Sequence, residues 1–328
     1  MPEHLPIGII RCLQTASSRQ GIFKILAIDH WDSMRELIHP ENPLEVSAAE
    51  LTDLKLQIIQ HVGSRATAVI VDPVYSAAQA VATGVLPGQV GFLAKVEQEA
   101  FVGLPHERRT ALIDDWDAAK AKRLGACGVK LFLYYHPFSG ELAERQEELA
   151  SHVALECAAA EIPFFLEPIV YSIDPAIPTE SREFAAQRRD LVIESARRMA
   201  KLQPTVLKLQ FPIDGNHEKD ESVWRDACTE LDSVTPVPWA ILSAGDPFEV
   251  FKTQLQVACE AGCSGFLAGR ALWREAAPLR GADRLAALDN VVLPRLEELN
   301  DIAERYGKSW TSKLPTQTVS DDWYRRGS

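Results

Sequence analysis

The feature that most constrains the fold is a regular alternation of short apolar runs and longer amphipathic segments. Eight runs have the composition of strands, over residues 24–29, 67–72, 91–95, 128–135, 164–168, 205–211, 238–243 and 265–268. Apolar residues at helical spacing lie between or after them, over residues 47–62, 109–124, 141–160, 181–202, 219–232, 247–261 and 284–305. Most of the strand runs are continuously apolar, which is typical of parallel strands buried on both faces.

This alternation predicts an α/β protein with the architecture of a (β/α)8 TIM barrel. An open, doubly wound sheet would be expected to carry a glycine-rich dinucleotide loop after the first strand, and that loop is absent. No linker rich in Pro, Gly or Ser divides the chain. We therefore expect a single barrel domain over 24–306, with an N-terminal extension over 1–23 and a C-terminal tail over 307–328.

Composition excludes several classes of function. The formal net charge of −12 argues against binding of nucleic acid through a basic face. The six cysteines form no CxxC pair, which favours reduced, buried thiols in a cytoplasmic protein. No apolar run is long enough to cross a membrane, so we expect neither a membrane span nor secretion.

The strand run over 205–211 carries a lysine in its centre. Lys208 lies between Leu207 and Leu209, where packing gives a charged side chain no role, because an ammonium group is costly to bury. A desolvated lysine at a strand end suits an amine nucleophile that forms a Schiff base with a carbonyl substrate. The alternative is a structural lysine that reaches the barrel rim or pairs with a carboxylate.

The two preceding strand runs also contain ionisable residues, Lys130 and Glu167. In a barrel of this kind the active site lies at the C-terminal ends of the strands, so these side chains are expected to meet Lys208. A second ammonium group near Lys208 would favour its neutral amine, and Glu167 could shuttle protons. The alternative is a structural Lys–Glu–Lys network within the barrel.

Three other strand ends carry charges. Asp29 follows the first strand and is a further candidate for the site. Asp72 follows the second strand and can equally be a helix N-cap. Lys95 is predicted to be a solvated residue at the rim.

Small residues and an arginine follow the last two strands. Ser243 and Gly245 come after the seventh strand, and Gly269 and Arg270 come after the eighth. Loops at these positions of a barrel often bind phosphate through backbone amides, and an arginine adds a fork of charged donors. The alternative is that the glycines serve only tight turns.

Five segments of the chain resemble the tagatose-1,6-bisphosphate aldolase family, which includes the sulfofructosephosphate aldolases. They are residues 129–135, 165–168, 207–212, 242–245 and 265–273, and the similarity extends from about residue 24 to about residue 310. The resemblance implies a class I, metal-independent aldolase on a (β/α)8 barrel, with no cofactor.

The same resemblance implies roles for individual residues. Lys208 would be the Schiff-base lysine, Glu167 the acid/base and Lys130 the supporting lysine. The positions that hold the phosphate of the dihydroxyacetone phosphate half are matched by Ser243, Gly245, Gly269 and Arg270.

One segment departs from the family pattern. The family commonly has Asp-Gln-Arg after the first strand, whereas this chain has Asp29, His30 and Trp31. Asp29 is kept, so we expect it to act on substrate hydroxyls or in catalysis. The Trp31 indole is an uncharged donor and His30 could help only when protonated, so neither replaces the Gln and Arg that the family associates with a distant anionic group. His30 and Trp31 remain candidate substrate-binding residues, and the aldehyde half of the substrate is left open.

The predicted function is the reversible cleavage of a phosphorylated ketose to dihydroxyacetone phosphate and an aldehyde, by a homo-oligomer without nucleic-acid or membrane partners. A sulfofructosephosphate aldolase-like or other ketose-phosphate lyase is the alternative within this class. A second alternative is a metal-dependent lyase or isomerase using Asp29, Asp72 and Glu167 with a histidine, although the eight histidines show no paired spacing. A third is a non-catalytic sugar-phosphate sensor on the same barrel.

Overall fold

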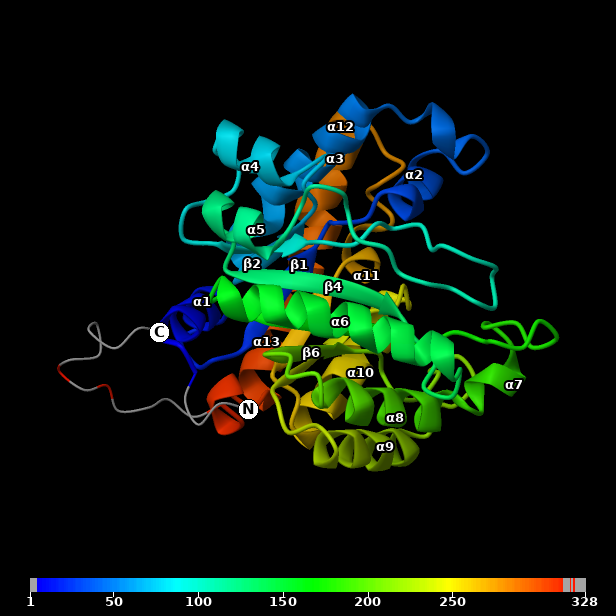
Figure 1. Cartoon of the computed structure of the whole chain (residues 1–328). Helices are drawn as coiled ribbons and strands as arrows, with labels where there is room; N and C mark the ends of the chain where they lie inside the picture. Colours follow the sequence, from blue (N-terminus) through cyan, green and yellow to red (C-terminus); the bar gives the residue numbers. More distant parts are fainter. Residues whose placement is uncertain (1–4, 315–318, 320, 322–328) are drawn as a thin grey trace.

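The strands form a closed parallel barrel in sequence order (Figure 1). The structure is a computed structural model that describes residues 5–314, 319 and 321. The strands are β1 (Phe23–Ala27), β2 (Ala68–Val71), β3 (Gly91–Lys95), β4 (Gly128–Tyr134), β5 (Phe164–Ile169), β6 (Val206–Leu209), β7 (Trp239–Leu242) and β8 (Gly265–Ala268). Pairing of β1 with β8 closes the barrel, which confirms the predicted (β/α)8 fold and all eight strands apart from small shifts at their ends.

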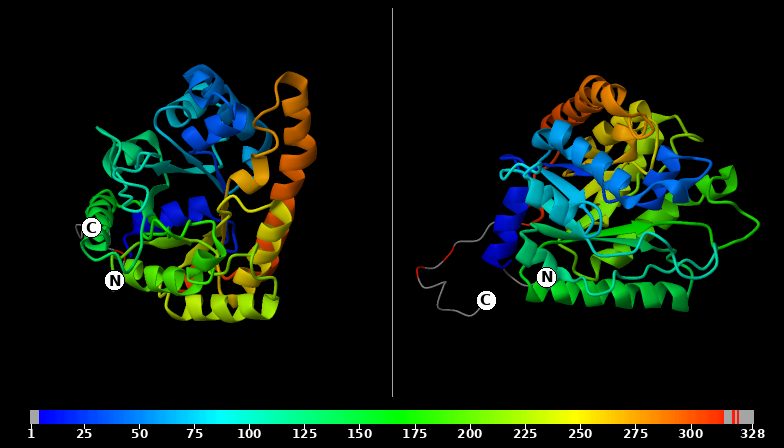
Figure 2. Two further views of the ribbon diagram at one scale, coloured as in Figure 1. Left: turned by 90° about the vertical axis from the view of Figure 1, so that its right-hand side faces the viewer. Right: turned by 90° about the horizontal axis from the view of Figure 1, so that it is seen from above.

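Helices surround the barrel (Figure 2). They are α1 (Ile7–Ala16), α2 (Asp32–Ile38), α3 (Ala48–Val62), α4 (Ala77–Thr83), α5 (Ala118–Leu124), α6 (Glu141–Ala159), α7 (Arg182–Ala185), α8 (Arg188–Ala200), α9 (Glu221–Ser233), α10 (Phe248–Ala261), α11 (Arg270–Trp273), α12 (Gly281–Ala287) and α13 (Leu293–Tyr306), with short turns η1 (Pro43–Glu45), η2 (Gly63–Arg65), η3 (Leu288–Val292) and η4 (Trp310–Ser312). Among the described helices, none combines the length and the apolar character needed to span a membrane.

The helix predicted over 109–124 is only half right. Its first half belongs to a long loop that makes isolated bridges, and α5 begins at Ala118. Asp115 has a left-handed backbone with φ of 55°, which interrupts a helix. Asp117 then caps α5, because its carboxylate accepts a hydrogen bond of 2.7 Å from the backbone N–H of Lys120.

Alternate strand residues point into the barrel, and this period places the charged residues. Phe165 of β5 and Val206 of β6 belong to an apolar cluster inside the barrel. Two residues further along the same faces lie Glu167 and Lys208. The inner surface therefore changes from apolar to charged toward the C-terminal ends of the strands.

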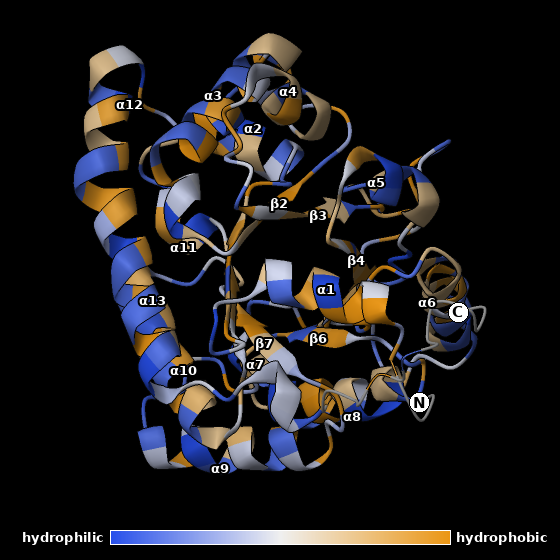
Figure 3. Ribbon diagram, turned by 90° about the vertical axis from the view of Figure 1, so that its left-hand side faces the viewer, coloured by the Kyte–Doolittle hydropathy of each residue, from blue (hydrophilic) through white to orange (hydrophobic). Residues whose placement is uncertain are grey.

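Helix α1 closes the opposite end of the barrel (Figure 3). Leu13 of α1 and Trp310 of η4 are buried in the same cluster as the start of β1. The Trp310 indole donates a hydrogen bond of 3.1 Å to the Ser17 hydroxyl. The described parts of the N-terminal extension and of the tail thus pack beneath the barrel, away from the charged end. The tail beyond residue 314 falls almost entirely outside the described residues.

Candidate active site

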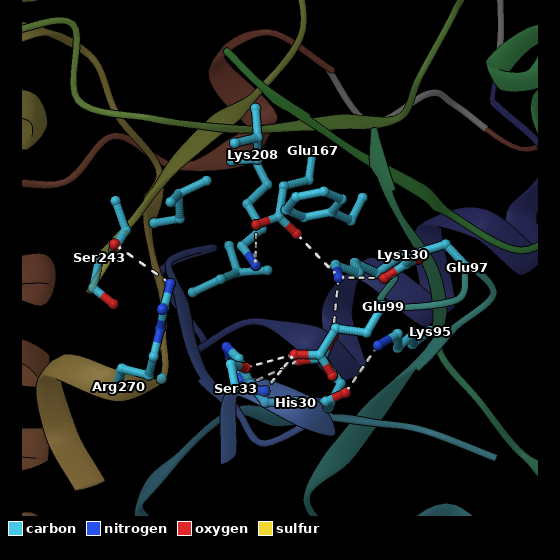
Figure 4. Close-up of a pocket in the computed structure, with 18 of the residues that line it drawn as sticks. His30, Ser33, Lys95, Glu97, Glu99, Lys130, Glu167, Lys208, Ser243 and Arg270 are labelled. Carbon is cyan, nitrogen blue, oxygen red and sulfur yellow. Dashed lines mark hydrogen bonds and ion pairs between the residues drawn. The ribbon is translucent and has the colours of Figure 1, made fainter. Parts of the chain in front are cut away.

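A cavity opens at the C-terminal ends of the strands, with an empty volume of about 970 Å³ that includes its open mouth. Residues from β1 and from β3 to β8, or from the loops just after them, line it. Its acidic and basic lining residues are Asp29, His30, Lys95, Glu97, Glu99, Lys130, Glu167, Lys208 and Arg270, all but Asp29 labelled in Figure 4. Ser243 and Gly269 also line the cavity, so it brings together most of the predicted site residues.

Lys208, Glu167 and Lys130 form a continuous chain of contacts. The Lys208 Nζ lies 2.8 Å from Oε1 of Glu167, and the other oxygen of Glu167 lies 3.2 Å from the Lys130 Nζ. Only 5% of the surface of Lys208 is exposed, so its amine meets the cavity and little bulk water. The arrangement provides a desolvated amine in direct contact with a group that can exchange protons with it.

Lys130 lies among three carboxylates. Its Nζ is 2.6 Å from Glu97, 2.9 Å from Asp29 and 3.2 Å from Glu167. Burial alone would lower the pKa of Lys130, but these three carboxylates together raise it well above its ordinary value. Lys130 is therefore a protonated lysine shared by three carboxylates. Their negative charge offsets the effect that a second ammonium group was expected to have on Lys208.

The carboxylates around Lys130 differ in their electrostatics. Burial would raise the pKa of Asp29, but Lys130, with further help from Lys95, lowers it well below its usual range. Burial dominates for Glu97, whose pKa is raised although Lys130 and Lys95 act against it. One oxygen of Glu97, Oε2, is buried without a hydrogen-bond partner. Asp29 is thus a fixed anion, whereas Glu97 is suited to hold a proton or to accept a hydroxyl from a ligand.

The prediction that Lys95 is solvated at the rim is wrong. Only 2% of its surface is exposed. Its ammonium donates a hydrogen bond of 3.1 Å to the backbone carbonyl of Asp29 and lies 4.4 Å from the centre of the Trp31 ring. Trp31 covers this lysine, and the cation–π contact compensates in part for the lost hydration.

Trp31 contributes to the site indirectly. Its ring packs edge-to-face on Tyr75, 5.8 Å away, and it is not among the residues that line the cavity. Glu99 holds the loop that carries it, by accepting hydrogen bonds from the backbone N–H groups of Trp31, Asp32 and Ser33.

Asp72 lies away from the cavity lining. Its carboxylate pairs with the fully buried Lys55 of α3 at 2.5 Å and accepts hydrogen bonds from the backbone N–H groups of Val74 and Tyr75. Asp72 therefore stabilises the turn after β2 by accepting hydrogen bonds from backbone N–H groups. This is close to the helix N-cap role given above as the alternative for Asp72.

Two arginines lie next to each other after β8. The Arg270 guanidinium is 3.4 Å from the Ala244 carbonyl, and Arg274 donates to the carbonyl of Gly245. Gly245 has φ of 86°, and a Cβ there would approach both guanidinium groups within 3.2 Å, so the turn needs glycine. Burial and the neighbouring Arg274 lower the pKa of Arg270, and the carboxylates of Glu99, Glu167 and Glu36 offset this only in part.

His30, in the loop that follows β1, lies at this end of the site. Its Nδ1 lies 4.0 Å from Asp29, and its ring packs edge-to-face on Trp273 at 5.2 Å. A Cβ at Gly269 would lie 2.8 Å from the ring, so glycine is required for the close approach. Burial, with Arg270 and Lys208 nearby, lowers the pKa of His30 to about 3 even though Asp29 favours its charged form. His30 is therefore neutral at physiological pH and adds no cation to the site.

Sequence reasoning missed Glu97 and Glu99. They follow Lys95 at alternate positions, so their side chains continue the inward face of β3 beyond its last paired residue, Lys95. This period of two was the available signal. The predicted strand run ends at Lys95, so Glu97 and Glu99 fall outside it.

The carboxylates of the cavity converge on a lysine. Within the described residues, no group of three or more His, Cys, Asp or Glu side chains is placed to hold a metal ion. Asp29, Glu97 and Glu167 do converge, but the ammonium of Lys130 lies between them.

The barrel and its buried lysine–carboxylate cluster define a barrel enzyme, and comparison with known proteins gives the family. A family model described as DeoC/LacD family aldolase matches residues 23–275. The chain belongs to the DeoC/LacD aldolase family and is a lyase of the aldolase type, which confirms the family resemblance.

Two curated relatives span almost the whole chain. The tagatose 1,6-diphosphate aldolase of Streptococcus agalactiae is 28% identical over 320 residues, which cover 92% of this chain and 97% of that protein. The enzyme of the same name from Lactococcus lactis is 26% identical, over 93% of this chain and 98% of that protein.

Solved structures share the fold. A fructose-bisphosphate aldolase from Plasmodium falciparum has a TM-score of 0.65 at 17% identity, covering 97% of this chain and 99% of that one. An archaeal fructose 1,6-bisphosphate aldolase has a TM-score of 0.61 at 17% identity, covering 90% and 98%. At this identity the likeness concerns the fold alone.

Proposed function

We propose that this aldolase works through a Schiff base on Lys208 and reversibly cleaves a phosphorylated ketose to dihydroxyacetone phosphate and an aldehyde. The observation that carries the proposal is the contact of 2.8 Å between the buried Lys208 amine and Glu167 inside the cavity. The names of the two curated relatives, both tagatose 1,6-diphosphate aldolases, support the ketose phosphate as substrate class.

The first half of the reaction uses Lys208 and Glu167. Contact with Glu167 allows the ammonium of Lys208 to give up a proton, and its neutral amine then attacks the ketose carbonyl carbon to form a carbinolamine. Glu167 returns the proton to the carbinolamine oxygen, which leaves as water, and an iminium ion remains. Lys130, on the other oxygen of Glu167, keeps this carboxylate in place.

The iminium ion drives the carbon–carbon cleavage. A carboxylate of the Lys130 cluster takes the proton of the hydroxyl group next to the breaking bond, and we assign this step to Asp29 or Glu97. The bond electrons move to the iminium nitrogen, so that an enamine forms and the aldehyde departs. Protonation of the enamine carbon followed by addition of water releases dihydroxyacetone phosphate and restores Lys208. The iminium ion is the electron sink, so the proposed sequence uses no cofactor.

The phosphate is assigned to the end of the cavity formed by β7 and β8. The Arg270 guanidinium and the Ser243 hydroxyl would bind it, and the turns at Gly245 and Gly269 allow close approach of the backbone. Neutral His30 lies between this end and Asp29, where its ring can donate a hydrogen bond to the substrate or accept one from it. Trp31 acts through Lys95, which it shields from water.

The test measures cleavage of ketose phosphates in the presence of a chelator, with Lys208→Arg as the control variant. We expect full activity with chelator, none in the variant, and inactivation by borohydride only when substrate is present. Loss of activity with chelator that a divalent metal restores would refute the Schiff-base mechanism. Absence of turnover with every ketose phosphate would favour the sugar-phosphate sensor.

A further inference from the structure

We infer that the preferred substrate carries one anionic group only, the phosphate at the β7–β8 end, and that its aldehyde half is an uncharged chain of hydroxyl groups. This inference rests on the proposed function and specifies its substrate class. It follows from the distribution of charge across the cavity.

The β7–β8 end has cations available for an anion. Arg270 lines the cavity and Arg274, which does not, lies close to it; among the described residues, their hydrogen bonds go to backbone carbonyls of the turn after β7. Within the described residues, neither has a carboxylate at ion-pair distance. A dianionic phosphate is the ligand that two unpaired guanidinium groups favour.

On the opposite side of the barrel, carboxylates outnumber the cations that a ligand could use. β3 and β4 lie across the eight-stranded barrel from β7 and β8, and Figure 4 shows Glu97 and Lys95 far from Ser243 and Arg270. Both cations that line the cavity on this side are already engaged, and Arg108, which packs on the Tyr134 ring, is not among the lining residues. Lys130 bonds three carboxylates, and Lys95 bonds the Asp29 carbonyl beneath the Trp31 ring.

Glu99 fixes a negative charge at this side. Its two oxygens accept from three consecutive backbone N–H groups and from the Ser33 hydroxyl, at 2.5 Å. Lys95, together with the Ser33 hydroxyl and the backbone N–H of Trp31, lowers the pKa of Glu99 in spite of its burial, so Glu99 stays ionised where these hydrogen bonds hold it. A second phosphate or a sulfonate at this side would face Glu99, and the lining cations there, Lys95 and Lys130, are already engaged.

Hydroxyl groups fit the same surface. Glu97 lines the cavity and its Oε2 has no hydrogen-bond partner, and Gln98 and Tyr134 add polar groups to the same lining. A chain of hydroxyls can donate to these acceptors, whereas a phosphate brings acceptors of its own and added charge. The two ends of the cavity are therefore selective for a phosphate at one end and for neutral hydroxyls at the other.

The first experiment compares kcat/KM for each D-ketohexose 1-phosphate with that for its 1,6-bisphosphate. We expect the monophosphate of the preferred configuration to be favoured by tenfold or more. Equal or higher kcat/KM for the bisphosphate would overturn the inference. Failure of the proposed function looks different, because then neither compound is cleaved and neither gives a borohydride adduct on Lys208.

A second measurement separates binding from chemistry. Hexitol 1-phosphates and hexitol 1,6-bisphosphates have no carbonyl group, so their competitive inhibition constants report binding alone. We expect the monophosphate to bind at least tenfold more tightly, and we expect the Glu97→Gln variant to reduce this difference severalfold. Tighter binding of the bisphosphate to the wild-type enzyme would contradict the inference even if Glu97→Gln failed to fold.

Discussion

Glu167 connects Lys208 to Lys130 through its two carboxylate oxygens, at 2.8 and 3.2 Å. A carboxylate in this position can exchange a proton with the amine on one side while the protonated lysine on the other side fixes its orientation. A purely structural Lys–Glu–Lys network would have the same distances but would not need to face a cavity. All three residues line the cavity, which supports the catalytic interpretation and leads to the first prediction.

Glu167→Gln should lower kcat by about 10²- to 10⁴-fold, because the amide keeps the shape of the side chain but cannot shuttle protons. Single-turnover kinetics should show slower formation of the Lys208 adduct. Glu147→Gln is a suitable control, since Glu147 pairs with Arg198 and Tyr135 outside the cavity. Retention of kcat within about tenfold in Glu167→Gln would argue for a structural role.

Lys130→Met should destabilise the protein by about 3–5 kcal/mol, since it takes the shared cation from three buried carboxylates, of which Glu167 keeps Lys208 as a second partner. Those carboxylates would then bind protons more readily in the folded state than in the unfolded state. The stability of the variant should therefore rise as the pH falls from 7 toward 5. Urea denaturation at several pH values measures this, and a variant whose stability falls over that range would contradict the cluster's electrostatics.

Lys55→Met provides the matched comparison for Lys130. It breaks an equally buried pair, with Asp72, that does not line the cavity. We expect a similar loss of about 3–5 kcal/mol but an unchanged kcat in the fraction that remains folded. The pair of variants separates the contribution of a buried charge to stability from its contribution to the reaction.

Arg270→Lys should raise KM for the phosphorylated ketose by about 10- to 100-fold, because lysine keeps the charge but loses the planar fork of donors. The rate with an unphosphorylated ketose should change much less. Arg295→Lys is the control, since Arg295 pairs with Glu275 away from the cavity. An unchanged KM in Arg270→Lys would show that Arg270 does not bind the phosphate at this end of the site.

A further prediction concerns the effect of His30 on the pH dependence of stability. Its pKa is about 3 in the folded protein against an ordinary value of 6.5, so the unfolded state binds its proton first. The protein should lose up to about 1.4 kcal/mol of stability for each pH unit below 6.5 through this residue. His30→Gln should remove this part of the loss, as measured by urea denaturation between pH 7 and 5. Identical pH profiles for the two proteins would show that His30 is protonated in the folded state.

The sequence predicted the barrel and the residues nearest the reaction for one physical reason. A charge inside a buried strand is so costly that Lys130, Glu167 and Lys208 stand out against apolar neighbours. The inward period of two then places them together in any closed parallel barrel.

The remaining features depend on contacts between distant segments. Lys95 is buried by the Trp31 ring, and Glu99 is held by a loop that lies more than sixty residues away in sequence. Neither contact leaves a local pattern. The hub role of Lys130 depends likewise on Glu97, which lies beyond the last residue of β3.

The most direct test of the account identifies which lysine forms the Schiff base. Lys95, Lys130 and Lys208 all line the cavity, so each is within reach of a carbonyl substrate in principle. Borohydride trapping with a ketose phosphate, followed by peptide mapping in a mass spectrometer, should place the whole label on Lys208 and none on the other two. Label on Lys95 or Lys130, or adduct formation that persists in Lys208→Arg, would contradict the mechanism.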